Sequence, residues 1–249
     1  MNSKDFIVVI PARLGSTRIR HKPLLDIHGL PLVIHVCRRV SQFVSKNRIF
    51  VATEADEVVD VCASHGYQAV VTSPNHSHPL DRVCEVALEI QASSAYLVVN
   101  GDEPFFSEDT IPKLLEDYES DSNFFVSNAA SRIVDVSDAL DPANIKIVVN
   151  SQNYAIYCSR APIPQPFGDL DIVYRKFVGI GMFSHEALRF FNITEETAVE
   201  KAERVSLLRF LAEFRKVKII DVAKESWSID TAMDYEKTKA MEITHYRTR

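Results

Sequence analysis

A cluster of cationic and hydrogen-bond-donating residues follows the first apolar run of this chain, residues 6–10. The cationic and titratable side chains of the cluster are Arg13, Arg18, Arg20, His21 and Lys22. Among them lie Gly15, Ser16 and Thr17, which allow close approach to the backbone and offer N–H and O–H donors. Basic, donor-rich loops after parallel strands are where α/β folds bind anionic ligands. The loop predicts an anion site; the alternative is a solvated basic loop.

Two aspartates are the other candidates for chemistry. Asp102 comes just after the apolar run 95–100, whose carboxyl end is expected at the same sheet edge as the basic loop. Asp230 lies at a later strand-to-helix junction, before a predicted helix over 231–243. A carboxylate in that position is also a common helix N-cap, so a capping role for Asp230 stays open.

Short apolar runs alternate with helical patterns through the first half of the chain. Runs rich in β-branched residues predict strands at 6–10, 48–53, 67–72 and 95–100. Apolar residues at helical spacing predict helices at 31–44, 55–65 and 80–91. This alternation predicts an α/β fold with a mostly parallel sheet that helices cover on both faces.

The second half of the chain is less regular. Strands are predicted at 123–131, 177–183 and 217–222, and helices at 107–118, 185–191, 197–215 and 231–243. Two extended runs, 145–150 and 154–158, flank a short polar turn and predict a β-hairpin. We expect residues 1–249 to form a single domain, to which residues 123–185 contribute a smaller inserted lobe.

Composition and charge exclude several classes of protein. The chain carries a net charge of -6, which argues against a nucleic-acid partner and makes the basic loop a local feature of an acidic protein. No apolar run reaches the ~18 residues of a membrane span, and the first residues lack the apolar stretch of a secretory signal. The four cysteines show no C-x-x-C spacing. We therefore expect a cytoplasmic protein without a disulfide or a zinc site.

Glycine usage excludes familiar nucleotide-binding and hydrolase motifs. The seven glycines form no G-x-G-x-x-G motif, and none of them precedes a lysine as in a Walker A loop. G-x-S-x-G is absent as well, which excludes the nucleophile elbow of the α/β-hydrolases.

Several segments together resemble one family of enzymes. They are P-A-R-x-G-S-T-R-x-x-x-K-P-L at 11–24, G-D-E-P at 101–104, Y-x-S-R-x-x-I-P at 157–164 and x-x-D-T-x-x-D at 228–234. This set resembles the sugar-activating cytidylyltransferases, above all the 3-deoxy-manno-octulosonate (Kdo) cytidylyltransferases, over the stretch from Phe6 to about Tyr235. The resemblance implies a Rossmann-like nucleotidyltransferase fold with a small inserted lobe and hairpin, a homodimer, and transfer of CMP from CTP to a small acidic acceptor.

The resemblance also assigns roles to individual residues. It implies Mg²⁺ on Asp102 and Asp230, which agrees with the preference of this ion for carboxylate and phosphate oxygens. It implies catalytic roles for Lys22, Asp102 and Asp230. The implied nucleotide-binding residues are Ala12, Arg13, Ser16, Arg18, Lys22, Asp81 and Arg82. The implied acceptor-binding residues are Asn100, Arg160, Phe177 and Ser206, and the alternative for Arg160 is a surface arginine after a strand.

This chain departs from the family pattern mainly in the half that would hold the acceptor. The family has glutamine, histidine and tyrosine where this chain has Asn100, Phe177 and Gly181, and Glu-Gln where it has Ser206-Leu207. The small Ser-Gly-Thr/Ser step before Asp81 is replaced by residues 78–80, His-Pro-Leu. The pattern predicts the same reaction on a different acceptor. A phosphonate acceptor, another base, and a nucleotide-binding protein without turnover are the alternatives.

Overall fold

The computed structural model describes residues 5–15, 19–90, 93–168 and 172–240, and these residues fall into two compact units. The first unit consists of Asp5–Phe106 and the segment that begins at Trp227, and the second unit consists of Ser107–Ser226. The single domain with a smaller lobe over 123–185 stays a prediction.

The first unit contains four parallel strands in the order β6-β1-β4-β5. Their bounds are Ala95–Val99 for β6, Phe6–Pro11 for β1, Ile49–Thr53 for β4 and Gln68–Val71 for β5. Two neighbouring strands of this set, β1 and β6, are buried along their whole length, as continuous apolar runs predict. The predicted order of strands and helices in this half is confirmed.

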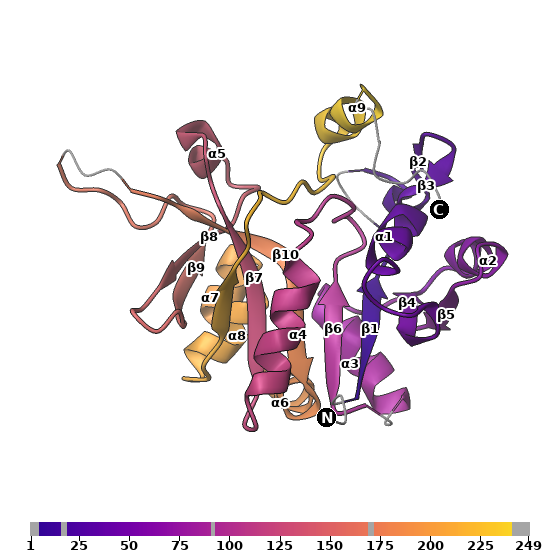
Figure 1. Cartoon of the computed structure of the whole chain (residues 1–249), viewed down its shortest axis with the longest axis horizontal. Helices are drawn as coiled ribbons and strands as arrows, with labels where there is room; N and C mark the ends of the chain where they lie inside the picture. The colour runs from indigo at the N-terminus through magenta and orange to yellow at the C-terminus, as the bar shows by residue number, and fades with distance from the viewer. Residues whose placement is uncertain (1–4, 16–18, 91–92, 169–171, 241–249) are drawn as a thin grey trace. The chain divides into compact units, whose positions relative to one another are not determined.

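Three helices connect these strands (Figure 1). They are α1 (Leu32–Val40), α2 (Asp56–Ser64) and α3 (Pro79–Glu89). Helix α3 packs on β1 and β4, whereas α2 packs on β4 and β5. Gly66 follows α2 with a φ of 74°, the left-handed conformation in which glycine commonly closes a helix. Two 3₁₀ turns, η1 (Lys22–Leu24) and η2 (Lys46–Arg48), a two-stranded ribbon of β2 (Asp26–Ile27) and β3 (Leu30–Pro31), and helix α9 (Ala232–Ala240) complete the unit.

The second unit is built on a mixed set of five strands. They are β7 (Val126–Arg132), β8 (Lys146–Val149), β9 (Ala155–Ser159), β10 (Arg175–Ser184) and β11 (Lys218–Asp221). Strand β7 pairs parallel with β11 and antiparallel with β10. Strands β8 and β9 pair antiparallel, which is the predicted hairpin. The predicted α/β fold with a mostly parallel sheet and a small hairpin is confirmed.

The helices of the second unit are α4 (Thr110–Ser120), α5 (Val136–Leu140), α6 (His185–Ile193), α7 (Ala198–Glu203) and α8 (Leu207–Ala212). The single helix predicted over 197–215 is therefore wrong. The helical conformation is interrupted at Arg204, whose left-handed φ of 52° ends α7. The break lets Arg209 of α8 form two short bonds, 2.7 and 2.9 Å, with the fully buried carboxylate of Glu200 in α7. This buried ion pair fixes the two helices against each other.

All four cysteines are buried and carry thiols rather than disulfides. Burial raises the pKa of the Cys62 thiol to about 11, so the sulfur is not reactive at neutral pH. Among the described residues, no helix has the length and apolar character that crossing a membrane requires.

Candidate active site

A cluster of one lysine and two aspartates lies in the first unit. The Lys22 Nζ atom is 2.6 Å from an oxygen of Asp102 and 3.2 Å from an oxygen of Asp230. The lysine side chain is 11% exposed, and the aspartate side chains are 29% and 21% exposed. Residues that are far apart in the sequence thus share one ion-paired cluster, and its carboxylates keep partial access to solvent.

Strand pairing places Lys22 and Asp102 at one edge of the sheet. Because β1 and β6 are neighbouring parallel strands, the loops that follow them leave the sheet at the same edge. The loop after β1 leads into η1, which Lys22 opens and in which Pro23 fixes the backbone. Asp102 lies three residues beyond the end of β6 at Val99.

Gly101 lets these two loops approach each other. Its N–H donates to the Pro11 carbonyl at 3.3 Å. A Cβ atom on residue 101 would lie 2.8 Å from the same carbonyl oxygen and 3.4 Å from the Cβ of Ala12. Only a residue without a side chain therefore fits between Pro11 and Asp102. The glycine of the G-D-E-P motif is thus required for steric reasons.

We expect Gly101→Ala to lower the free energy of unfolding by about 1–3 kcal/mol, because the added methyl group overlaps a backbone oxygen at the end of a buried strand. Chemical denaturation followed by fluorescence measures this change. Gly15→Ala is the matched control, because a Cβ on residue 15 meets no atom within 4 Å. Equal stabilities of the two variants would contradict the steric explanation.

A returning segment brings Asp230 to the cluster. Trp227 forms an antiparallel bridge with Phe105, and the Ile229 N–H donates to the Asp102 carbonyl at 2.9 Å. The Ser228 hydroxyl donates to the second carboxylate oxygen of Asp230 at 2.9 Å. These contacts leave the first oxygen of Asp230 directed at Lys22.

The alternative role of Asp230 as a helix N-cap is wrong. The Thr231 Oγ1 atom accepts a bond from the Asp234 N–H at 3.2 Å, and Asp234 Oδ2 accepts from the Thr231 N–H at 2.8 Å. This reciprocal pair is a capping box for α9, so Thr231 rather than Asp230 caps the helix. The carboxylate of Asp230 is thereby available to the cluster.

The electrostatics of the cluster favour a cation between the aspartates. Burial alone would lower the pKa of Lys22, but the charges of Asp102 and Asp230 and their hydrogen bonds outweigh it and raise the pKa above its ordinary value. The lysine is therefore charged and neutralises two carboxylates. Two carboxylates that converge on one cation, with part of their surface open, also fit the hard oxygen donor set that Mg²⁺ takes.

The other predicted nucleotide-binding residues of the basic loop lie in several settings. Arg13 is exposed in the loop after β1. Ala12 is buried, and its N–H donates to the Ala52 carbonyl at 2.8 Å, so its contribution is a small side chain rather than a free donor. Ser16 and Arg18 lie outside the described residues.

Asp81, Arg82 and Asn100 have structural partners in the first unit. Asp81 accepts a bond from the His78 N–H at 2.8 Å at the start of α3. Arg82 is 2% exposed and pairs with Glu54 at 2.8 Å. The Asn100 carbonyl accepts from the Glu103 N–H, and the asparagine is half-buried. Roles of Asp81 and Arg82 in nucleotide binding, and of Asn100 in acceptor binding, stay predictions.

Arg160 in the second unit is tied to the protein itself. Its guanidinium donates to the carbonyls of Glu203, at 2.7 Å, and Pro142, at 2.8 Å, and its N–H donates to the Glu203 carboxylate. Lys146, which is fully buried, donates to three carbonyls including that of Arg160. Arg160 is therefore half-buried and anchored, unlike the loose surface arginine of the alternative interpretation.

The remaining positions where this chain departs from the family pattern divide into two groups. Phe177 and Ser206 are half-buried, at β10 and just before α8. Gly181 and Leu207 are interior: a Cβ on residue 181 would lie 2.7 Å from the Asn128 side-chain oxygen, and Leu207 is 3% exposed. A tyrosine therefore has no room at position 181 beside Asn128. Glycine in place of the family's tyrosine thus changes the packing of the interior at this position.

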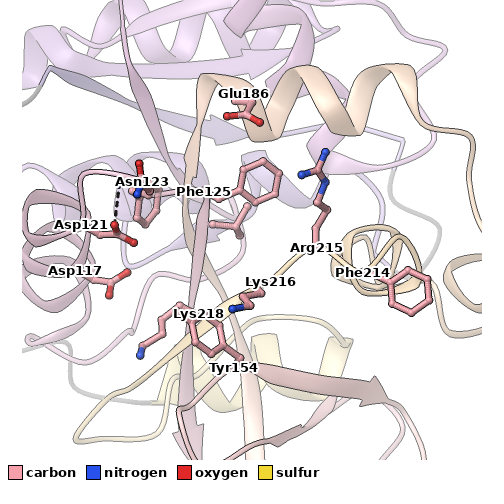
Figure 2. A pocket seen from close by; sticks show the side chains of 12 residues that line it. Asp117, Asp121, Asn123, Phe125, Tyr154, Glu186, Phe214, Arg215, Lys216 and Lys218 are labelled. Atoms are coloured by element: carbon pink, nitrogen blue, oxygen red, sulfur yellow. Dashed lines mark hydrogen bonds between the residues drawn. The ribbon is translucent and has the colours of Figure 1, made fainter.

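A cavity of about 460 Å³ opens in the second unit (Figure 2). It lies at the amino ends of β7 and β11, where Tyr154, Arg215, Lys216 and Lys218 meet the acidic residues Asp117, Asp121 and Glu186. None of its lining residues belongs to the predicted site. Sequence patterns missed it because its residues come from four separate stretches of the chain, namely 117–126, Tyr154, Glu186 and 214–218.

Glu54 and Ser228 were also missed by sequence reasoning. Glu54 directly follows the carboxyl end of β4, the same kind of position that singled out Asp102. An acidic residue at the end of a central parallel strand is thus a signal that could have found it. Ser228 precedes Asp230 by two residues and gave no signal of its own.

The fold and the site define an α/β nucleotidyltransferase. The cytidylyltransferase family model matches residues 7–219. The 3-deoxy-manno-octulosonate cytidylyltransferase of Escherichia coli is 32% identical over 235 residues, which cover 94% of this chain and 95% of that protein. The chain belongs to the 3-deoxy-manno-octulosonate cytidylyltransferase (CMP-Kdo synthetase) family, and it is a cytidylyltransferase of this family.

Solved structures agree with this assignment. A CMP:2-keto-3-deoxy-manno-octonic acid synthetase complexed with CTP matches with a TM-score of 0.88 and 32% identity, over 95% of this chain and 98% of that one. The inositol-1-phosphate CTP transferase of T. maritima matches with a TM-score of 0.68 at 15% identity, over 96% of each chain. The second likeness shows the fold alone.

Proposed function

We propose that this enzyme transfers CMP from CTP to a hydroxyl of a small acidic acceptor, Kdo-like or a variant of it, and releases pyrophosphate in the presence of Mg²⁺. The cluster of Lys22, Asp102 and Asp230 carries the proposal, because it combines a fixed cation with two carboxylates at the edge of a parallel sheet. Support comes from the related synthetase whose structure contains CTP.

The chemistry requires positioning and neutralisation of charge more than covalent help. The acceptor hydroxyl attacks the α-phosphorus of CTP, and pyrophosphate leaves in line. Arg13 and Arg18 bind the triphosphate through paired N–H bonds. Lys22 donates to phosphate oxygens as charge develops on them. Asp102 and Asp230 would hold the Mg²⁺ ion, which when bound lowers the negative charge facing the nucleophile.

The acceptor is proposed to differ from ordinary Kdo. Phe177, at a position where the family has histidine, is half-buried and apolar, and Ser206 is shorter than the family's glutamate. A site discriminates hydroxyls through matched hydrogen bonds, and each lost bond is worth about 0.5–1.5 kcal/mol. Arg160 is retained as a cation for an acidic acceptor. An acceptor with fewer hydroxyls, or a phosphonate, therefore fits better than Kdo.

We expect Kdo to react with a kcat/KM about 10- to 10²-fold below that of the best acceptor, since two lost hydrogen bonds together amount to about 1–3 kcal/mol. Pyrophosphate release, measured over a grid of four nucleoside triphosphates and a panel of sugar acids, deoxy or acylated sugar acids and phosphonates, tests both parts of the proposal. Kdo as the best acceptor would overturn the proposed difference. Equal use of all four triphosphates would overturn the choice of CTP.

A homodimer is also proposed, with residues 123–185, which include the hairpin, as the contact region. Exposed apolar side chains support this: Val134, Val136, Leu140 and Phe167 are 86%, 65%, 65% and 98% exposed, and they all belong to the second unit. Extensive exposed apolar surface is a common mark of a protein contact. We expect twice the chain mass by light scattering at micromolar concentration, and a monomer for Leu140→Asp combined with Phe167→Asp. A wild-type monomer would contradict the proposal.

The proposed compartment is the cytoplasm, and no nucleic-acid partner is proposed. Four buried thiols fit a reducing environment. The net charge of -6 disfavours nucleic acid as a partner.

A further inference from the structure

The loop that follows β1 is attached to the end of β4 at two points. The first is the bond from the Ala12 N–H to the Ala52 carbonyl, at 2.8 Å, which continues the strand pairing. The second is a bond from the Leu14 N–H to the Oε1 atom of Glu54, at 2.9 Å. Leu14 lies between Arg13 and Gly15, so the Glu54 side chain holds the backbone near the start of the basic loop.

The other oxygen of Glu54 is held by a buried arginine. The Arg82 guanidinium lies 2.8 Å from Oε2, and the two side chains are 3% and 17% exposed respectively. Arg82 also donates to the Thr72 hydroxyl, at the end of β5. A guanidinium buried to this extent requires a counter-charge, because an unpaired buried cation is strongly destabilising. Arg82 thus fixes the direction of the Glu54 carboxylate.

The pairing of Glu54 with Arg82 suits a position beside an anion site. A carboxylate accepts a bond from a backbone N–H more strongly than a neutral oxygen does. An unpaired carboxylate at this place would also repel the phosphate groups of a nucleotide. Pairing with Arg82 cancels the charge and keeps the strong acceptor, so the loop is held without opposing the ligand.

We infer that Glu54 and Arg82 form a positioning pair, which holds the backbone of residues 12–15 in the conformation that receives the triphosphate. The inference rests on the proposed function for the identity of the ligand. Neither residue is proposed to touch the reacting atoms. Arg82 acts through Glu54, and Glu54 acts through Leu14.

Two measurements test the pair, and the first needs no nucleotide. In Glu54→Ala, we expect the Leu14 amide hydrogen to exchange with solvent at least about tenfold faster than in the wild type, as followed by NMR, because its acceptor is lost. Glu54→Gln keeps an acceptor oxygen and should restore most of the protection. Glu57→Ala is the matched control, since Glu57 is an exposed carboxylate at the start of α2.

The second measurement is the affinity for CTP by calorimetry, together with kcat. Glu54→Ala and Arg82→Met should each weaken CTP binding about tenfold and change kcat at saturating CTP less, with Arg82→Lys between them and the wild type. Arg39→Met controls for loss of a buried arginine, because Arg39 donates to the Phe106 carbonyl instead of the loop. Unchanged exchange at Leu14 in Glu54→Ala overturns the inference.

The two hypotheses fail separately. If the wild type binds no CTP but Leu14 exchange responds to Glu54 as expected, the choice of nucleotide is wrong and the positioning pair stands. If CTP binds and Leu14 exchange is the same in all variants, the pair is wrong and the proposed function stands. Should Glu54→Ala not fold, Leu14 exchange in Arg82→Met decides in its place, since only a positioning pair makes this exchange depend on an arginine that bonds to Glu54 and not to Leu14.

Discussion

Replacing either aspartate of the cluster by asparagine is expected to lower kcat about 10³-fold, because a metal clamp on phosphate oxygens contributes several kcal/mol, about 1.4 kcal/mol per decade. Asp102→Asn and Asp230→Asn should both fold normally. Their side chains are 29% and 21% exposed, and an asparagine oxygen can still accept from Lys22. Pyrophosphate release at saturating CTP and acceptor measures kcat, and circular dichroism checks the fold.

Metal dependence separates a role at the ion from a role in folding. The wild type should lose activity with a chelator and recover it with Mg²⁺ or Mn²⁺, and the Asp variants should recover little at any metal concentration. Glu57→Gln, an exposed carboxylate outside the cluster, serves as the control and should behave as the wild type. Full activity in Asp102→Asn or in Asp230→Asn would remove that residue from the metal site.

Lys22→Ala is expected to lower kcat by about 10²–10³-fold and to raise KM for CTP by less. The reason is that a fixed donor aimed at developing charge contributes most in the transition state. The ammonium is held in place before the ligand arrives by its bonds of 2.6 and 3.2 Å to the aspartates. Initial rates over a range of CTP concentrations separate the two constants. A change in KM alone would show that Lys22 binds the ground state and the transition state equally.

Lys22→Arg is the informative companion variant. It keeps the charge, but the guanidinium is larger than the ammonium. The Lys22 side chain is only 11% exposed, so the larger group has little space. We expect a partial recovery of kcat if charge dominates, and none if the compact shape of the ammonium is needed between the aspartates.

The strands and helices of the first unit could be predicted from sequence because their patterns are local. Buried parallel strands appear as continuous apolar runs, and Gly66 marks the end of its helix by its own conformation. The predicted strand 6–10 stops one residue before the observed end of β1, which is Pro11. Pro11 cannot donate a bond, but its carbonyl still accepts from Gly101, so the strand includes it.

The predictions that failed depended on side-chain contacts that residue types alone do not specify. No residue type in 197–215 marks Arg204 as left-handed, and the pairing of Arg209 with Glu200 across the break forms only in the folded chain. The capping role considered for Asp230 failed for a related reason. Asp and Thr are both good N-caps, and only the bond from Asp234 to Thr231 decides between them.

The residues of the site also divide into those that the sequence predicts and those that it does not. Lys22, Asp102 and Asp230 could be found because their types and their places at element ends are visible in the sequence. The partners that hold the loop could not, since Glu54 reaches Leu14 over 40 positions and nothing in the sequence links them to Arg82. Arg160 looked like a ligand-binding cation, yet its bonds to Pro142 and Glu203 show how much of its geometry serves the fold.

The order in which the first unit is synthesised follows from its two-segment construction. Lys22 and Asp102 leave the ribosome early, whereas Asp230 lies 208 positions after Lys22 and emerges on the order of ten seconds later than its partners. The second unit is made in between, and its two ends are joined by bonds from Lys224 to Ser107 and from Ala223 to Asp109. Folding of the second unit therefore brings Trp227 close to Phe106. The long connection between the two segments of the first unit is then closed at a lower entropy cost. A nascent chain that has not yet released Asp230 lacks one of the two carboxylates, so the cluster assembles only after the whole second unit has been synthesised.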